Sequence, residues 1–303
     1  MSDVLLAKNR LLVISSSGAF ANFNPLQLQG VYDELDTFLT GHGDSLDSIE
    51  LFTLYELQFY LSVMTNHDIK AKSILDRLLD QFGSNKKSQR IKLLQSIYLE
   101  AVGEKAAATK LLEQNMDETL LSRRLVTFTR NNENEADNEE YISTLNFYLN
   151  LSPSDLVAWA ELAHEYTRSG HYDKAVFCYK EILLQEPHAY PIFYQVGLNY
   201  YYQFLQEERN LKTDKKDKIV EMTQLLSYSR DNFLRSIEIC DVYSLSWVGL
   251  YALTGLKFND KLAKVKEVSG YLAKNDKLRE LSEKKIKQLL PEQDLAEVLL
   301  QLK

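Results

Sequence analysis

Apolar side chains recur along most of this 303-residue chain at intervals of three and four residues, the spacing of one face of an α-helix. The pattern is clearest between residues 155 and 188, where two such stripes follow one another. The first stripe consists of Trp159, Leu162, Ala163 and Tyr166, and the second of Ala175, Tyr179 and Ile182. The segment therefore predicts two helices whose apolar faces pack together.

A glycine and two prolines set the limits of this helix pair. Gly170 lies between the stripes, where a residue that tolerates a left-handed conformation ends the first helix. Pro187 stops the second helix and lies 34 residues after Pro153. A helical hairpin with a 34-residue period is the signature of tetratricopeptide repeats. The predicted fold class is therefore all-α, a tetratricopeptide-repeat solenoid that winds as a right-handed superhelix.

The unit that starts at Tyr190 has the same first stripe but a delayed second helix. Its first stripe is formed by Phe193, Val196, Gly197 and Tyr200, and its second by Ser229, Phe233 and Ser236. About twenty residues are therefore inserted, at about 203–222, and they include the charged sequence EERNLKTDKKDK at 207–218. We expect both helices to be extended, with a solvated loop between them.

Weaker copies of the helix pair flank these two units. The positions that repeat the stripes are Ala71, Leu75, Leu78, Ala107, Leu111, Tyr141, Leu145, Tyr148, Trp247 and Leu250. We expect an N-terminal helical flank at 1–50, repeats at 51–255 with 156–189 as the best unit, and capping helices at 256–303. One repeat cannot bury its apolar face alone, so neighbouring units stack and leave a concave face that binds peptides and helices.

The charge and the cysteines limit the class of protein. The net charge of −8 argues against nucleic-acid binding, which needs an excess of Lys and Arg. Cys178 and Cys240 both lie in apolar helical stretches, as expected for core thiols in a reducing compartment. The N-terminus lacks a secretory pattern, and the longest uncharged stretch, 189–206, is too short and polar to cross a bilayer. These features predict a cytosolic protein that reaches a membrane only through partners.

The five histidines give no recognisable catalytic or metal site. His164 and Glu165 begin like a zinc protease motif, but Arg168 stands where the second histidine is required. Glu161 and His164 have the spacing of half a di-iron site, without a second copy elsewhere. Phosphate-binding glycine loops are also missing from the sequence. We therefore predict no catalytic residue, no metal and no cofactor, and a protein that is not an enzyme.

The concave face of the two clearest units carries several aromatic side chains. The inward-facing positions of the first helices predict a partner-binding groove formed by His164, Arg168, Tyr194, Leu198, Tyr201 and Tyr202. Tyrosine buries apolar area and keeps a hydroxyl for hydrogen bonding, which favours a protein interface. The alternative is that some of these rings pack beneath the inserted loop. Ala160 and His164 cannot form the Lys and Asn clamp that binds chaperone tails, although Lys92 has a suitable position in an earlier unit.

The best repeat also resembles a known family. It reads D-x-x-AW-x-ELA-x-x-Y, then Y-x-KA-x-FC and PH, and it resembles subunit 2 of the endoplasmic reticulum membrane protein complex, in a fungal-type form. The later sequences SRDNFLRSIEI and SLSWVGLYALT are similar to that family as well.

The resemblance implies a non-catalytic scaffold attached peripherally to the cytosolic face of the endoplasmic reticulum membrane. Its partners would be other subunits of that complex, including cytosolic segments of the transmembrane subunits, in a complex that inserts tail-anchored and multipass proteins. The alternative function is a free cytosolic adaptor that binds peptide segments of client or chaperone proteins.

Overall fold

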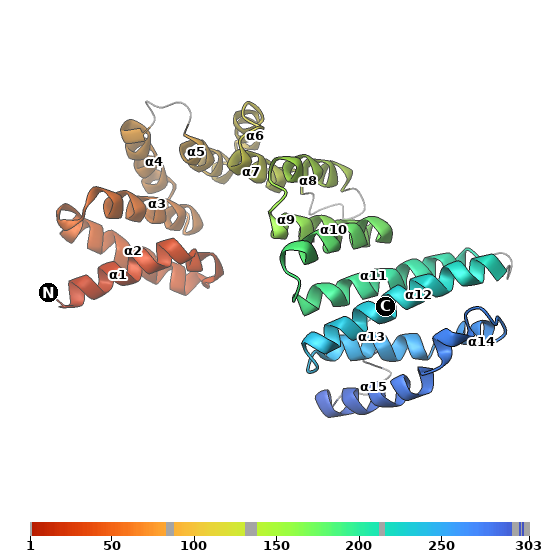
Figure 1. The fold of residues 1–303 in the computed structure, drawn as a ribbon. Coiled ribbons are helices and arrows are strands. Elements are labelled where there is room, and N and C mark those ends of the chain that lie inside the picture. Colours follow the sequence, from red (N-terminus) through yellow and green to blue (C-terminus); the bar gives the residue numbers. More distant parts are fainter. Residues whose placement is uncertain are drawn as a thin grey trace. The chain divides into compact units, whose positions relative to one another are not determined.

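The structure, a computed structural model, describes residues 2–82, 88–130, 138–211 and 216–292, together with residues 297 and 299. These residues form α-helices and short 3-10 helices joined by turns, with no strand in any of the described ranges. The chain divides into two compact units, residues 1–130 and 131–303 (Figure 1).

The first unit contains seven α-helices in its described residues. They are α1 (Ser2–Ser17), α2 (Pro25–His42), α3 (Ser48–Met64), α4 (Asp68–Phe82), α5 (Gln89–Ala101), α6 (Lys105–Glu113) and α7 (Thr119–Thr129), with the 3-10 helices η1 (Ala19–Asn22) and η2 (Gly43–Ser45). Local chemistry explains where two of them begin. Asn24 and Gln27 form a reciprocal capping box at the start of α2, and Asp47 and Glu50 do the same for α3.

Three apolar clusters hold the first unit together. Leu11, Leu35 and Leu54 bring α1, α2 and α3 together in one cluster. Phe59 and its neighbours join α3 to α4 and α5, and Leu112 joins α6 to α7. Each helix therefore packs mainly against the helices next to it in the chain, as expected for a repeat architecture.

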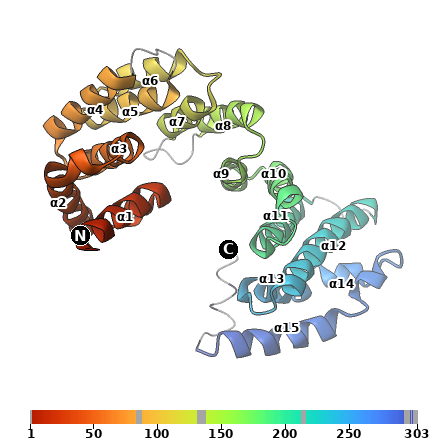
Figure 2. The same cartoon turned by 60° about the vertical axis from the view of Figure 1, so that its left-hand side comes forward.

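The second unit contains eight α-helices in its described residues (Figures 1 and 2). They are α8 (Glu139–Leu151), α9 (Leu156–Arg168), α10 (Tyr172–Gln185), α11 (Tyr190–Arg209), α12 (Lys216–Ile239), α13 (Ser244–Thr254), α14 (Asn259–Leu262) and α15 (Asn275–Leu289), with the 3-10 helix η3 (Ser269–Leu272). Both views show α9 to α13 lying side by side in chain order.

The helix pair α9 and α10 has the form that the sequence predicts. The carboxylate of Asp155 accepts hydrogen bonds from two backbone N–H groups and so begins α9. Gly170 has a φ of 73°, the left-handed conformation expected between the two helices. Ala163 and Ala175 are both fully buried, so the backbones of α9 and α10 lie close together. The side chain of Trp159 is half-buried and donates a hydrogen bond to the carbonyl of Pro153 at 2.9 Å.

The predicted extension of the next helix pair is confirmed. Helices α11 and α12 have 20 and 24 residues, compared with 13 and 14 in α9 and α10. Part of the charged insertion therefore continues the two helices, while residues 212–215 lie outside the described ranges. The capping segment expected at 256–303 contains α14, η3 and α15, and residues 293–296, 298 and 300–303 of it are likewise outside them.

The core of the second unit centres on one ring. The side chain of Phe233 in α12 lies between Gly197 of α11 and Gly249 of α13. Ser229 adds a hydrogen bond from its hydroxyl to the carbonyl of Gly197 at 2.6 Å. This arrangement explains why the delayed stripe of Ser229, Phe233 and Ser236 is completely buried.

The predicted upstream stripe at Ala107 and Leu111 is wrong by one residue. Ala107 is exposed and Leu111 half-buried, whereas Ala108 and Leu112 are fully buried. The turns between α6 and α9 do not keep the 34-residue spacing, so the buried positions precede those of α10 by 67 residues and not by 68. The other predicted stripes are confirmed as buried: Ala71, Leu75, Leu78, Tyr141, Leu145, Tyr148, Trp247 and Leu250.

Alanine at Gly197 or Gly249 is expected to destabilise the second unit. A Cβ atom would lie 2.8 Å from the ring of Phe233 at position 197 and 2.5 Å from it at position 249. Such overpacking costs about 1–3 kcal/mol. Thermal unfolding followed by circular dichroism measures the effect.

Gly30→Ala in α2 is the matched control, because no atom lies within 4 Å of a Cβ built there. Alanine improves helix propensity by about 0.5–1 kcal/mol at such a site. Unfolding midpoints that rise for all three variants would contradict the packing argument.

Candidate partner-binding groove

A cavity of about 990 Å³ opens within the second unit. Its walls come from the end of α9, the start of α10, the second half of α11, α13 and α15. Four tyrosines line it: Tyr172, Tyr201, Tyr202 and Tyr251. We call this cavity and its walls the tyrosine groove.

The extension of α11 supplies one wall of the tyrosine groove. Tyr201 lies after eleven residues of that helix, and Leu205 and Arg209 continue the same wall toward its end. The ring of Tyr202 lies 5.6 Å from that of Tyr172, at the start of α10, and 6.1 Å from that of Tyr201. The predicted insertion therefore lengthens the surface on which a partner could bind.

Two of the tyrosines in the groove walls have neutral hydroxyls. Burial raises the pKa of Tyr201, with a further increase from the nearby carboxylate of Glu208. Burial also raises the pKa of Tyr202. Both hydroxyls therefore stay neutral at physiological pH and can donate or accept hydrogen bonds.

Two guanidinium groups line the same groove. Arg209 and Arg279 have no carboxylate within salt-bridge distance in the described part of the chain. The guanidinium carbon of Arg279 lies 5.3 Å from the ring centre of Tyr251, which leaves its N–H groups able to bind an acceptor. Aromatic walls with two cations suit a segment that carries both apolar side chains and carboxylates.

Four of the six predicted groove residues keep an accessible surface. Tyr201 and Tyr202 lie on the cavity wall, and whether a partner binds them remains a prediction. His164 and Arg168 are exposed on α9 but do not line the cavity.

The prediction that Tyr194 and Leu198 face the groove is corrected by the structure. They are only 4% and 8% exposed and belong to the apolar cluster of the second unit. The ring of Tyr194 lies 5.8 Å from that of Phe233 and 5.7 Å from that of Tyr243. The long α12 packs over this part of α11 and buries both side chains. The ring contacts of Tyr194 are with residues that follow the insertion, so both side chains belong to the core of this unit.

Glu165 carries a buried carboxylate that the sequence patterns did not predict. Glu165 is 3% exposed, and its carboxylate accepts a hydrogen bond from the amide of Asn138 at 2.7 Å. The guanidinium of Arg168 lies 3.3 Å from both carboxylate oxygens. Glu165 follows Leu162 by three residues, so the spacing of the buried stripe could have revealed its burial. Its role is to join the start of α8 to α9.

The remaining groove residues could not have been chosen from local patterns. Tyr251 and Arg279 belong to α13 and α15, and only tertiary packing brings them to the end of α11.

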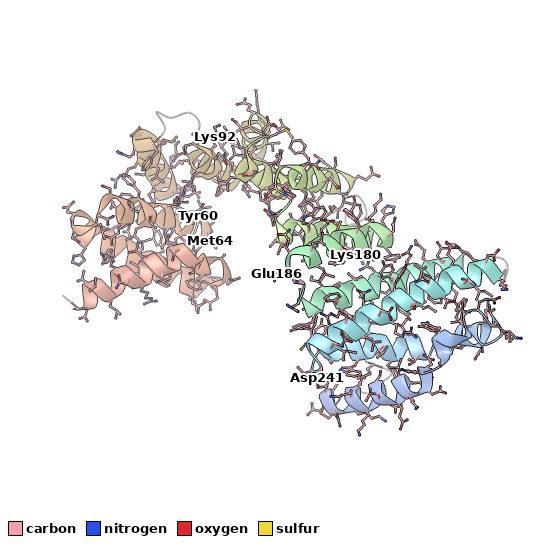
Figure 3. All side chains as sticks on the ribbon, viewed as in Figure 1. Tyr60, Met64, Lys92, Lys180, Glu186 and Asp241 are labelled. Carbon is pink, nitrogen blue, oxygen red and sulfur yellow. The ribbon has the colours of Figure 1, made fainter. Side chains whose placement is uncertain are left out.

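Lys92, the one candidate for a chaperone-tail clamp, is already engaged. Lys92 lies on α5 (Figure 3). Its ammonium group donates to the side-chain carbonyl of Asn115 at 2.5 Å and lies 3.6 Å from the carboxylate of Glu118. Its side chain is 15% exposed.

No three His, Cys, Asp or Glu side chains in the described ranges are placed to hold a metal ion. No described helix combines the length and hydrophobicity that a bilayer span requires. Both cysteines are free thiols, and burial raises the pKa of Cys178 to about 12.

The fold defines the class of protein. A solved structure of the C-terminal part of a tetratricopeptide-repeat protein from Cytophaga hutchinsonii aligns with a TM-score of 0.56 at 12% identity. The alignment covers 96% of this chain and 99% of that one. Together with the helical hairpins and their spacing, this confirms the predicted all-α tetratricopeptide-repeat solenoid.

Part of the sequence is similar to a described repeat family. Residues 69–204 match the family described as the EMC2 TPR-like repeat domain. The chain is 24% identical to the endoplasmic reticulum membrane protein complex subunit 2 of Saccharomyces cerevisiae, over 90% of this chain and 96% of that protein.

Two further relatives match shorter parts. The TPR repeat protein oca3 of Schizosaccharomyces pombe is 27% identical over 66% of this chain and 65% of its own length. Subunit 2-B of the same complex from Xenopus laevis is 29% identical over 57% of this chain and 56% of its own length. The predicted resemblance to subunit 2 of that complex is confirmed.

Alkaline pH is expected to destabilise the second unit through Tyr194. Burial raises the pKa of its hydroxyl above the ordinary value near 10. Because the folded-state pKa exceeds the unfolded one, the contribution to stability is complete below about pH 10 and is lost as the pH rises toward the folded-state pKa.

Tyr194→Phe keeps the ring and removes the ionisable group. Its unfolding midpoint is therefore expected to fall less between pH 9 and pH 11 than that of the unmodified chain, because this range spans the ordinary tyrosine pKa of about 10. Tyr228→Phe, at an exposed position of α12, serves as the control. Equal pH dependence in all three proteins would contradict the assignment.

Proposed function

We propose that this chain is a non-catalytic scaffold subunit of an endoplasmic reticulum membrane protein complex. The observation that carries the proposal is the match of residues 69–204 to the EMC2 TPR-like repeat domain, supported by likeness to the yeast subunit over nearly the whole chain. The repeat fold adds a physical reason, because stacked helical hairpins offer large surfaces for other proteins.

The tyrosine groove is the proposed binding site for a segment of a partner subunit. Its volume of about 990 Å³ lies at the upper end of the range of small-molecule pockets, so several residues of a peptide can enter it. Tyr201, Tyr202 and Tyr251 provide aromatic surface, while Arg209 and Arg279 attract carboxylates. A cytosolic segment of a transmembrane subunit with apolar and acidic side chains meets both requirements.

The proposed location is the cytosolic face of the endoplasmic reticulum membrane, with attachment through the partner subunits. The two free thiols agree with a reducing compartment. In this position the chain would organise the cytosolic parts of a complex that inserts membrane proteins.

Purification of the tagged chain from membranes in mild detergent tests the scaffold function. Because a scaffold is bound continuously to its partners, we expect membrane proteins to be recovered in stoichiometric amounts, as measured by quantitative mass spectrometry. Recovery of the chain alone, or with soluble chaperones and peptides, would overturn the proposal and favour a free adaptor.

Reversal of the groove charges tests the proposed binding site. The double substitution Arg209→Glu and Arg279→Glu places two carboxylates against an acidic segment, so partner recovery is expected to fall by at least about ten-fold, equivalent to about 1.4 kcal/mol. Circular dichroism checks that the helices are retained.

Lys277→Glu with Lys284→Glu is the matched control, since it changes the net charge equally at exposed positions of α15 that do not line the groove. This variant is expected to recover partners normally. An equal loss for both pairs would show that overall charge, and not the groove, governs the interaction.

A further inference from the structure

A further cavity lies in the first unit, on the surface of α4, α5 and α6. It has a volume of about 400 Å³, and each residue that lines it belongs to one of these three helices. Helix α5 packs against both α4 and α6 (Figure 2). Apolar side chains provide most of the lining: Leu75, Leu79, Leu99, Ala107 and Leu111. We call this cavity and its lining the leucine groove.

The one-residue shift of the buried face of α6 explains why the leucine groove is apolar. Ala108 and Leu112 turn into the core of the first unit, so their neighbours Ala107 and Leu111 line the groove. Ala107 is exposed and Leu111 is half-buried. Helix α6 therefore has two adjacent apolar faces, of which the core covers one. Because a helix that borders water needs only one apolar face, the second is expected to contact another protein.

The polar side chains of the leucine groove are cationic or uncharged. Lys72 and Lys110 line it together with Gln95 and Gln114. The ammonium group of Lys72 lies 2.9 Å from the carboxylate of Asp76. Lys110 is exposed and forms no ion pair with any residue that the structure describes. A carboxylate next to an apolar side chain is therefore the chemistry that complements this groove.

We propose that the leucine groove binds an amphipathic helix of a partner protein, which inserts an apolar side chain between α4 and α6 and places a carboxylate beside Lys110. On a helix, a carboxylate three or four residues from the apolar side chain lies on the same face. A helix also satisfies its own backbone hydrogen bonds. An extended segment would find few backbone partners here, since the backbone groups of α4, α5 and α6 are already bonded within those helices. The proposal goes beyond the tyrosine groove, because it concerns the other unit and other residues.

Selection of peptides against the purified full-length chain tests the proposal. The probe is a phage-displayed library of stabilised helical peptides with randomised residues on one face. Counter-selection on the Ala107→Trp chain, whose indole ring fills the leucine groove, removes peptides that bind elsewhere, including the tyrosine groove. The surviving peptides are expected to carry an apolar residue with Asp or Glu three or four residues away. Fluorescence anisotropy of the synthetic peptides is expected to show binding at least about ten-fold weaker to Ala107→Trp and to Lys110→Glu.

Ala106→Trp and Lys105→Glu are the matched controls, because they make the same changes at exposed positions of α6 that do not line the groove. Both chains are expected to bind the selected peptides as the unmodified chain does. Circular dichroism compares the helix content of all the variants. If Ala107→Trp loses helix content, Lys110→Glu decides, since a charge reversal at an exposed position leaves the core intact.

The proposal would be overturned if no peptide survives counter-selection, if the survivors lack carboxylates, or if the control variants weaken binding equally. These results are independent of the scaffold function, because the peptide assay uses the purified chain alone. Failure of the selection together with normal recovery of membrane partners would remove the leucine groove and leave the scaffold function. Successful selection without any recovered membrane partner would do the reverse.

Discussion

The second unit depends on the close approach of three helices around Phe233. Neither Gly197 nor Gly249 leaves room for a side chain beside this ring, so α11 and α13 both lie directly against it. Hydroxyl groups reinforce the contact: Ser229 donates to the carbonyl of Gly197, and Ser236 donates to that of Tyr190 at 2.8 Å. Because the buried hydroxyls find carbonyl partners, the helices approach closely without leaving these polar groups unpaired.

This packing determines which tyrosines of α11 are available to a partner. Tyr194 lies in the part of the helix covered by α12 and becomes part of the core. Tyr201 and Tyr202 lie two turns further on and reach the cavity, where α13 and α15 form the opposite wall. A single helix thus provides structural aromatic residues at its start and a candidate binding surface toward its end.

Local patterns were sufficient to predict the fold but only part of the site. The pair α9 and α10 could be predicted because its stripes, its glycine and its prolines lie within one 34-residue segment. The burial of Tyr194 could not be predicted from local patterns, because it depends on packing against α12, which the insertion moves further along the sequence. The same limit applies to Arg279, which reaches the groove only through the packing of α15 on α13. The error at Ala107 has a simpler cause, because one residue fewer in the connecting turns shifts the buried face of α6.

The long pair α11 and α12 also limits how this hairpin can change in length. An α-helix presents the same face again after about seven residues, or two turns, and rises about 1.5 Å per residue. Adding such a block to each helix would lengthen the pair by about 10 Å and keep both apolar faces opposed. Adding one or two residues to either helix would instead rotate its far end by about 100° per residue and turn apolar side chains toward water. Variation in this hairpin is therefore expected in steps of whole turns.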